Sequence, residues 1–407
     1  MRIGFDAKRA FNNYTGLGNY SRFIIESLLK YIPKHEYFAY TPKVIGSWQA
    51  SVGSSQFLID SSQSAIGSLQ SAVGNLQSSV SHSPSALNIR LPTENWRLTT
   101  SLWRSWLINN DLQKDHIDIY HGLSNELPYG ISKTGIKSVV TIHDLIFIRY
   151  PELYPAIDRF FYQQKFKYAC QTADAIVAVS QQTKQDIIDF YKIPSERIQV
   201  IYQDCQDIFH HRIANKQIIE KVKQKYGIQK SYLLCVSSFS ERKNQLRLIQ
   251  AFQSLNLNGC ELVLVGGQSK YLNQIEKYLS QSKQAGENTT NIRILTTVPA
   301  EDLPALYQGT SLFVYPSFFE GFGIPIVEAL HSGVPVVAAT GSCLEEAGGN
   351  GALYANPLDV NDLANKMHQV LSNERLGNEL VLKGSQYVKQ FAAENIANQL
   401  NQLYQSI

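Results

Sequence analysis

The chain has 407 residues, of which 44% are hydrophobic and 17% charged, with a formal net charge of +3. This length predicts two globular domains of about 150–200 residues each, and the small net charge, with no basic block, argues against nucleic acid as a partner. No apolar run approaches the roughly 18–20 residues that span a bilayer, and the N-terminal MRIGFDAKRAF lacks the apolar core of a signal peptide.

Short apolar runs alternate with helical patterns along most of the chain, which is typical of α/β proteins with parallel sheets. The first half predicts the strands RIGFDA, IDIYHG, KSVVTIHD and ADAIVAVS. The second half predicts SYLLCVSS, ELVLVGG, NIRILTTV, SLFVYPS and VPVVAAT. Two such series predict two Rossmann-like lobes, residues 1–201 and 202–387, because the pattern loses its period after Ile201. We expect a last helix at 388–407 to pack on the first lobe.

A low-complexity segment interrupts the first lobe at about residues 47–85, where Ser, Gln, Gly and Ala dominate. This composition favours a disordered or mobile insertion, with a weak amphipathic helix as the alternative. Three tryptophans and two arginines follow the insertion closely. Such a stretch is typical of a peripheral membrane contact or of a helix that packs on the lobe, and both remain open. The residues are Trp96, Arg97, Trp103, Arg104 and Trp106.

The five cysteines are widely spaced and form no Cys-x-x-Cys pair. This pattern favours structural thiols in a reducing compartment over disulfides or a metal site, so we expect a cytoplasmic protein without a bound metal. The cysteines are Cys170, Cys205, Cys235, Cys260 and Cys343.

Two groups of residues in the first lobe have the chemistry of a site. Gly16 and Gly18 lie in YTGLGNY between the first strand and the first helix, where a helix N-terminus favours phosphate. His121, His143 and Asp144 follow or end neighbouring strands, and open α/β sheets bind ligands at those ends. A histidine there can orient a hydroxyl or move a proton near neutral pH, although a satisfied core histidine is the alternative for either one.

The second lobe has two further groups. Arg242 and Lys243 follow a strand and a short turn, which is well placed for a diphosphate. Glu320 and Glu328 bracket a glycine-rich turn, and Pro325 suits the start of a helix there. Two glutamates at this spacing could be glycosidase carboxylates, but a loop residue and a helix residue more readily contact different parts of one ligand. A nucleoside diphosphate sugar has that elongated shape with an anionic middle.

The stretch FFEGFGIPIVEALHSGVPVV resembles the E-x7-E signature of retaining family-4 glycosyltransferases with the GT-B fold. SSFSERKN resembles their diphosphate loop, GLGNYSR their N-terminal glycine loop, and VVTIHDL with PELYP an acceptor-side segment. The motifs occur in family order and cover nearly the whole chain except the insertion. The resemblance implies two Rossmann-like lobes with parallel sheets facing across a cleft. It places the acceptor on the first lobe and the donor mainly on the second.

By this resemblance Glu328 holds the ribose, Glu320 contacts the donor sugar, and Arg242 and Lys243 neutralise the diphosphate, so that no divalent metal is needed. His121 matches a histidine near the transferred sugar. Glu320, His121, Arg242 and Lys243 are therefore the expected catalytic residues. The other expected donor-binding residues are Gly16, Gly18, Val298, Gly321, Phe322, Gly323, Ile324 and Pro325. His143 and Asp144 are expected on the acceptor side.

The expected function is transfer of a hexose, with mannose as the preferred sugar, from a nucleoside diphosphate sugar such as GDP-mannose. The acceptor is a hydroxyl of a glycan or a lipid-linked molecule, and the anomeric configuration is retained. One departure from the family lies between the lobes, where Asp204 replaces a glycine that is usual in a hinge turn. Two alternatives are a nucleotide-sugar epimerase or hydrolase of the same fold, and a non-catalytic scaffold subunit of polysaccharide assembly.

Overall fold

The computed structural model describes residues 1–407 except 14, 45–56, 60–86, 93–101, 258 and 287. Of the predicted insertion at about residues 47–85, the structure describes Phe57–Ile59, which form a strand. This strand corrects the prediction of an insertion without regular structure at those three residues. The rest of the insertion, with Trp96 and Arg97, lies outside the described residues.

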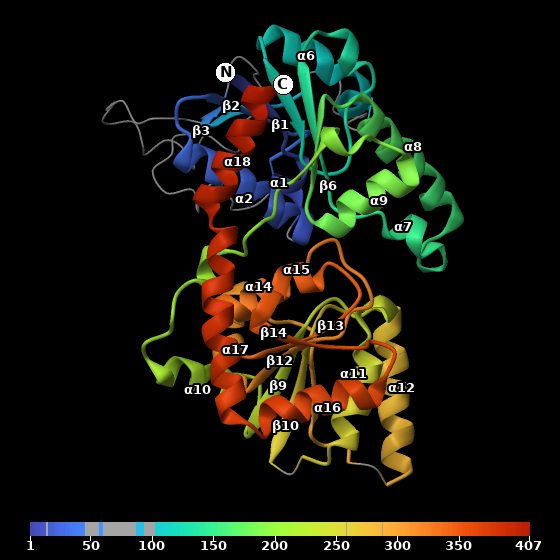
Figure 1. The fold of residues 1–407 in the computed structure, drawn as a ribbon, viewed down its shortest axis with the longest axis vertical. Helices are drawn as coiled ribbons and strands as arrows, with labels where there is room; N and C mark the ends of the chain where they lie inside the picture. Colours follow the sequence, from blue (N-terminus) through green and yellow to red (C-terminus); the bar gives the residue numbers. More distant parts are fainter. Residues whose placement is uncertain (14, 45–56, 60–86, 93–101, 258, 287) are drawn as a thin grey trace. The chain divides into compact units, whose positions relative to one another are not determined.

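The described chain divides into two compact units (Figure 1). Unit 1 comprises Met1–Val179, Thr183–Gln203 and Ala393–Ile407, and unit 2 comprises Ser180–Gln182 and Asp204–Ala392. The main change from unit 1 to unit 2 therefore falls between Gln203 and Asp204, beside the predicted boundary at 201. The C-terminal residues from Ala393 onward belong to unit 1.

Among its described residues, unit 1 has an eight-stranded sheet in which every pair is parallel, in the order β3-β4-β2-β1-β5-β6-β7-β8. The order reverses direction between β1 and β5, which makes the carboxyl ends of these two strands a topological switch point. The central strands are buried on both faces, so their sequences are continuous apolar runs. The strands are β1 (Arg2–Asp6), β2 (Glu36–Tyr40), β3 (Phe57–Ile59), β4 (Leu87–Arg90), β5 (Ile119–Gly122), β6 (Lys137–Ile142), β7 (Ala175–Ala178) and β8 (Ile198–Val200).

Helices surround this sheet (Figure 1). The last helix, α18, packs against α2 and buries Ile396, Ala397 and Leu400 completely. The α-helices of the unit 1 region are α1 (Lys8–Asn12), α2 (Gly16–Tyr31), α6 (Ile108–Lys114), α7 (Ile146–Arg149), α8 (Ala156–Thr172), α9 (Gln181–Tyr191) and α18 (Ala393–Ser406). A π-helical turn at Trp103–Leu107 precedes α6.

Unit 2 has a six-stranded sheet among its described residues, again with every pair parallel, in the order β11-β10-β9-β12-β13-β14. Its switch point lies between β9 and β12. The strands are β9 (Ser231–Val236), β10 (Cys260–Val265), β11 (Ile292–Leu295), β12 (Leu312–Tyr315), β13 (Val336–Ala339) and β14 (Ala352–Ala355). The α-helices are α10 (Lys216–Lys225), α11 (Gln245–Ser254), α12 (Lys270–Gln284), α13 (Leu303–Gln308), α14 (Ile324–His331), α15 (Leu344–Gly348), α16 (Val360–Leu371) and α17 (Glu374–Tyr387).

The tryptophan-rich stretch is mostly part of the fold of unit 1. Trp103 is 2% exposed, and its indole N–H donates a hydrogen bond of 2.7 Å to Asp111. Arg104 is held in buried ion pairs, whereas Trp106 is 58% exposed. Trp103 is buried and the Arg104 side chain is 12% exposed and held in ion pairs, so for these two residues the structure favours packing on the lobe, and the membrane contact stays a prediction. No helix in the described parts of the chain is long and apolar enough to cross a bilayer.

Candidate functional site

The switch point of the unit 2 sheet brings together two loops that are far apart in sequence. One loop follows β9 and ends at Asn244, and the other follows β12 and ends at Gly323, where α14 begins. Asn244 is 1% exposed and adopts a left-handed backbone with φ of 63°. Its Nδ2 atom donates to the carbonyls of Pro316, at 3.1 Å, and Pro357, at 2.7 Å. Asn244 therefore fastens the first loop to the second.

The two loops place a carboxylate against two cations. Glu320 is 9% exposed, and its Oε1 atom receives four polar contacts. These come from Lys243 Nζ at 2.5 Å, Arg242 Nη1 at 2.7 Å, Ser317 Oγ at 2.5 Å and the Tyr315 hydroxyl at 3.2 Å. The Lys243 ammonium also donates to the Tyr315 hydroxyl at 2.6 Å. We call Arg242, Lys243 and Glu320 the unit 2 charge cluster.

The unit 2 charge cluster has one negative charge and two positive charges. Burial alone would raise the pKa of Glu320, but Lys243 and Arg242 outweigh burial and lower this pKa to about 2. Burial lowers the pKa of Lys243, and Glu320 opposes that shift. With Glu320 ionised and both cations charged, the cluster carries a surplus positive charge in a largely buried place. Because an unbalanced buried charge is costly, this arrangement suits an anionic ligand.

The glycine-rich turn connects this cluster to α14. Gly323 has φ of 122°, and a Cβ atom there would lie 2.8 Å from Leu344 Cδ2, so only glycine fits. Pro325 lies in the first turn of α14, where its missing N–H costs no hydrogen bond. The first amides of α14 thus follow the turn directly and favour an anion. Phe322 is 3% exposed and packs edge-on against Phe391, so any contact it makes with a donor is through its backbone.

Glu328 lies on α14 in a different environment from Glu320. Its Oε2 atom accepts a hydrogen bond of 2.7 Å from the Tyr307 hydroxyl. Burial raises the pKa of Glu328 to about 7, although the Tyr307 hydrogen bond opposes this shift. The two glutamates of the motif are therefore held in opposite ways, one ionised by cations and the other close to protonation near neutral pH.

Three other residues of the predicted donor site are partly exposed: Val298, which follows β11, and Gly321 and Ile324, which flank the turn. Sequence reasoning missed the hydrogen-bonding groups Ser317, Tyr315 and Tyr307. Tyr315 is the last residue of β12, and Ser317 follows it in the run YPS. Their position a few residues before the predicted acid Glu320 was the signal that could have identified them.

In unit 1, Gly16 and Gly18 belong to the first turn of α2, and not to a loop before it as predicted. A Cβ atom on Gly18 would lie 1.8 Å from the Asn13 carbonyl oxygen, so the close chain approach requires glycine there. A Cβ atom on Gly16 would meet no described atom within 4 Å. Gly18 is thus explained by packing, whereas Gly16 leaves the exposed N-terminus of a long helix open to a ligand.

The two histidines that the sequence predicted for the unit 1 site are both buried. His121 is fully buried, with Nδ1 2.7 Å from the Tyr404 hydroxyl and Nε2 2.8 Å from Thr141 Oγ1. Burial lowers its pKa to about 3, and His143 adds to the shift. These are the contacts of a structural histidine, so the predicted catalytic role of His121 gains no support from this geometry.

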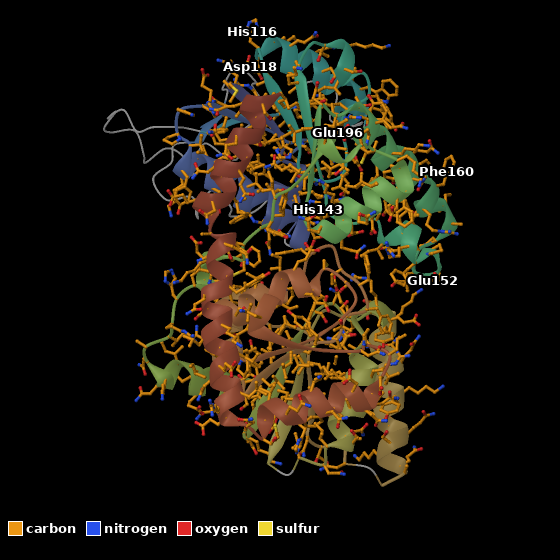
Figure 2. All side chains as sticks on the ribbon, viewed as in Figure 1. His116, Asp118, His143, Glu152, Phe160 and Glu196 are labelled. Carbon is orange, nitrogen blue, oxygen red and sulfur yellow. The ribbon has the colours of Figure 1, made fainter. Side chains whose placement is uncertain are left out.

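His143 follows β6 and is 8% exposed (Figure 2). Its Nε2 atom lies 2.9 Å from the Leu123 carbonyl oxygen, which requires Nε2 to carry the proton when the ring is neutral. Burial lowers the pKa of His143 to about 4, so the ring is neutral at physiological pH. Asp144 is partly exposed and accepts a hydrogen bond of 3.2 Å from the Ile146 amide.

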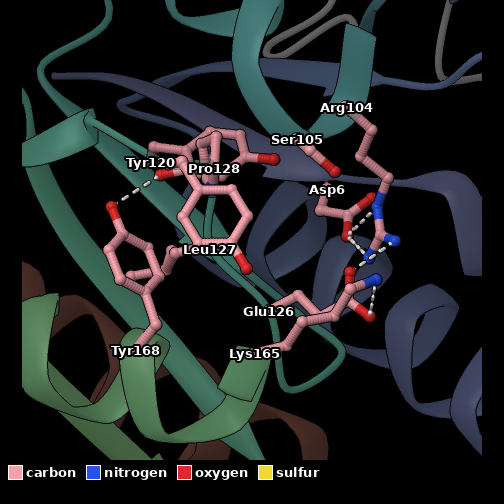
Figure 3. A pocket seen from close by; sticks show the side chains of 10 residues that line it. Asp6, Arg104, Ser105, Tyr120, Glu126, Leu127, Pro128, Lys165 and Tyr168 are labelled. Carbon is pink, nitrogen blue, oxygen red and sulfur yellow. Dashed lines mark hydrogen bonds and ion pairs between the residues drawn. The ribbon is translucent and has the colours of Figure 1, made fainter. Parts of the chain in front are cut away.

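A second charged site, which the sequence did not predict, lies at the switch point of unit 1 (Figure 3). Arg104 lies 2.5 Å from Asp6 and 2.8 Å from Glu126, and Lys165 lies 3.4 Å from Glu126. We call these four residues the unit 1 charge cluster. Two acids and two bases balance one another around a small pocket, which is also lined by Tyr120, Tyr129 and Tyr168.

Comparisons with known proteins bear on the family of the chain. The model for glycosyl transferases group 1 matches residues 218–390, and the model for glycosyltransferase family 4 matches residues 75–203. The chain is 33% identical over 306 residues to O-antigen chain mannosyltransferase B of Escherichia coli, covering 74% of this chain and 76% of that protein. It is 28% identical over 287 residues to the serotype-specific mannosyltransferase WbdA of Escherichia coli, covering 69% of this chain and 35% of that longer protein.

Solved structures agree on the fold. Anabaena Alr3699/HepE, crystallised in complex with UDP and glucose, superposes with a TM-score of 0.68 at 18% identity, covering 100% of both chains. An identity this low shows a shared fold but gives no evidence of a shared substrate. Three findings agree: the two parallel sheets, the motif loops at the unit 2 switch point, and the level of identity to the first relative. The chain therefore belongs to the group 1 glycosyltransferases and has the GT-B fold.

Proposed function

We propose that this glycosyltransferase moves mannose from GDP-mannose to a hydroxyl of a glycan or lipid-linked acceptor, with retention of the anomeric configuration. The observation that carries the proposal is the surplus positive charge of the unit 2 charge cluster beside the first amides of α14. Relatives named as mannosyltransferases, at 28% and 33% identity, support the choice of sugar.

The diphosphate is the group that the cluster suits. Arg242 offers a planar fork of donors and Lys243 a compact charge, and both suit phosphate oxygens. As the bond between the sugar and the diphosphate breaks, negative charge grows on the leaving oxygen. Cations and amides that are already oriented stabilise this charge more in the transition state than in the ground state. The reaction then needs no divalent metal at the diphosphate.

The two glutamates take different parts of the same donor. Glu320 holds Lys243 and Arg242 in place through Oε1 and lies where the turn reaches the sugar. Glu328 offers its carboxyl group to the ribose hydroxyls, with Tyr307 fixing its position. His143 and Asp144, which follow β6 in unit 1, are proposed for the acceptor side. A peripheral membrane contact for a lipid-linked acceptor would use Trp106, the exposed tryptophan among the described residues of that stretch.

The direct test is a panel of nucleotide sugars measured by thermal shift and product analysis. At 100 times its Kd, the true donor stabilises the protein by about 2.7 kcal/mol, which corresponds to roughly 5–10 °C for a domain of this size. We expect GDP-mannose to exceed UDP-glucose and UDP-N-acetylglucosamine. A larger shift with a UDP-sugar would overturn the choice of donor.

Product analysis separates the proposed reaction from its alternatives. We expect a mannosylated acceptor that retains the anomeric configuration, detected by NMR, and GDP in equal amount. Rapid release of free sugar, or an epimerised nucleotide sugar, in the absence of any acceptor would overturn transfer as the main reaction.

A further inference from the structure

Four side chains with metal-binding chemistry meet in unit 2 away from the unit 2 charge cluster. Asp204 Oδ1 lies 3.0 Å from His331 Nε2, and Asp204 Oδ2 lies 3.4 Å from His210 Nε2. The two imidazole rings stack with centroids 4.0 Å apart. Cys205 completes the group, and one ligand atom from each of the four residues lies within 4.8 Å of all the others.

The buried carboxylate of Asp204 lies at the centre of this group, and its Oδ1 atom also accepts a hydrogen bond of 2.8 Å from the Cys205 amide. The side chain is 1% exposed, and its Oδ2 atom has no hydrogen-bond partner of normal geometry within the described part of the chain. A buried carboxylate is costly unless it is paired or coordinates a metal. The imidazole nitrogens that face it are the commonest metal ligands in proteins. The four side chains therefore place potential metal ligands around one point.

We propose that Asp204, Cys205, His210 and His331 bind a divalent transition-metal ion, and the mixture of one sulfur, two nitrogen and one oxygen ligand favours zinc. Bonds of about 2.0–2.3 Å in a tetrahedral zinc site give ligand-to-ligand distances of about 3.3–3.8 Å. The distances of 3.0 and 3.4 Å from Asp204 to the histidines are close to this range. The widest pair needs to close by about 1 Å, which rotation of the side chains supplies. Binding releases the Cys205 thiol proton to solvent, because the thiolate is the ligand.

The place of this site in the chain gives the metal a structural consequence. Asp204 and Cys205 are the first residues of unit 2 after the change from unit 1. His331 is the last residue of α14, about one helical turn beyond Glu328. A metal ion would link the start of unit 2, at Asp204 and Cys205, to the C-terminal end of α14. The first turn of α14 follows the glycine-rich turn. This departs from the prediction, made from cysteine spacing, that the chain holds no metal, and it is separate from the metal-free diphosphate site.

Metal content and cobalt spectroscopy of the full chain test the proposal. The protein is purified without a polyhistidine tag, and we expect about one zinc ion per chain by mass spectrometry. After removal of the metal, added Zn²⁺ should raise the melting temperature, since a ligand that binds only the folded state stabilises it. Co²⁺ should give a thiolate-to-cobalt charge-transfer band and the intense visible bands of a tetrahedral site.

Variants identify the ligands. Cys205→Ser should lose the charge-transfer band, and His331→Gln should weaken Co²⁺ affinity at least about 10-fold. Cys260→Ser, which alters a half-buried cysteine on β10 outside the group, should behave like the native chain. The proposal fails if the native chain, loaded with Zn²⁺ or Co²⁺, shows neither thermal stabilisation nor cobalt absorbance. It also fails if the band persists in folded Cys205→Ser. If that variant does not fold, an unchanged Co²⁺ affinity in His331→Gln overturns the assignment.

Discussion

The two charge clusters occupy corresponding places in the two sheets but differ in charge balance. In unit 1, Asp6 ends β1 and Glu126 follows β5, the two strands that flank the switch point. Arg104 pairs with both acids and Lys165 pairs with Glu126, so these four residues together carry no net charge. In unit 2, the loops after β9 and β12 flank the switch point in the same way. There, Glu320 faces both Arg242 and Lys243.

Under the proposed function, this difference separates a network that supports the fold from one that binds an anionic donor. A balanced group of buried charges satisfies itself, and removal of one member exposes the others to the cost of burial. A group with a surplus cation is suited to an anionic ligand. Under the proposed function, the same position in two similar sheets serves stability in one unit and donor binding in the other. Substitutions that remove one cation from each cluster should then have opposite consequences.

The largest expected effect is the loss of stability in Arg104→Met. The Asp6 side chain is 3% exposed, so its carboxylate would remain buried without its ion-pair partner, and breaking such a pair typically costs about 3–5 kcal/mol. Urea unfolding, with hydrogen exchange of β1 and β5 peptides to locate the loss, measures the effect. Arg2→Met is the matched control, because its pair with Glu36 is exposed and should contribute no more than about 1 kcal/mol. Equal losses in the two variants would contradict a stabilising unit 1 charge cluster.

Lys243→Met should weaken donor binding without this loss of stability. Truncating one partner of a buried charge pair typically costs about 2–5 kcal/mol in affinity, or about 30-fold or more in the Kd for GDP-mannose. The folded protein should lose less stability than Arg104→Met does, because Glu320 keeps its ion pair with Arg242. Calorimetric titration and thermal unfolding measure the two effects. Lys225→Met, which alters an exposed pair with Asp302, is the control. A variant that unfolds easily yet binds the donor normally would make the unit 2 cluster a second structural network.

Glu320→Gln should lower turnover by about 100-fold, because the cations that it positions lose their geometry. Stability gives a second measurement. The pKa of Glu320 is lowered from 4.5 to about 2, so its carboxylate stabilises the native fold above about pH 4.5, and this contribution disappears as the pH falls toward 2. The variant should therefore lose less stability on acidification than the native chain. Glu241→Gln, at the exposed neighbour of Arg242, should alter neither property. Native turnover in Glu320→Gln would remove this residue from the reaction.

The sequence predicted the parts of the fold whose cause is local. Central strands such as β6 and β12 are buried on both faces, which makes them recognisable apolar runs. Sequence reasoning missed β2, β4, β8 and β14, and also β3, which lies in a low-complexity context. All of these except β2 lie at or next to an edge of their sheet. A short strand at or near the edge of a sheet depends on its neighbour for its conformation. Its residues alone do not identify it.

The same distinction applies to the site. Arg242, Lys243 and Glu320 could be identified because each follows a recognisable strand in a recognisable motif. Contacts across long sequence separations could not be predicted. His121 is covered by Tyr404, which lies 283 positions away, and Asp204 meets His331 across 127 positions. Local periodicity indicates that a residue ends a strand, but not which distant side chain packs upon it.

The smallest expected effect concerns the second glutamate and depends on pH. Burial raises the pKa of Glu328 from 4.5 to about 7, with the Tyr307 hydrogen bond opposing, so the folded chain holds this proton more tightly than the unfolded chain. The resulting stability is complete below about pH 4.5 and is lost as the pH rises through about 7. Glu328→Gln cannot ionise. Its melting temperature relative to the native chain should therefore improve by about 2–4 °C between about pH 5 and pH 8, the shift that roughly 1 kcal/mol produces.

Donor binding should show the opposite pH trend at this position. An ionised carboxylate accepts hydrogen bonds from both ribose hydroxyls, whereas a protonated one accepts fewer. The affinity of the native chain for GDP-mannose should then rise between about pH 6 and pH 8, and that of Glu328→Gln should be lower and independent of pH. Glu379→Gln is the control, because the pKa of Glu379 is lowered by its exposed pair with Lys383 and the group stays ionised across this range. If Glu328→Gln follows the same pH profile as the native chain in both melting temperature and affinity, then Glu328 does not titrate near neutral pH and does not hold the ribose. The opposed environments of the two glutamates would in that case serve the fold of α14 alone.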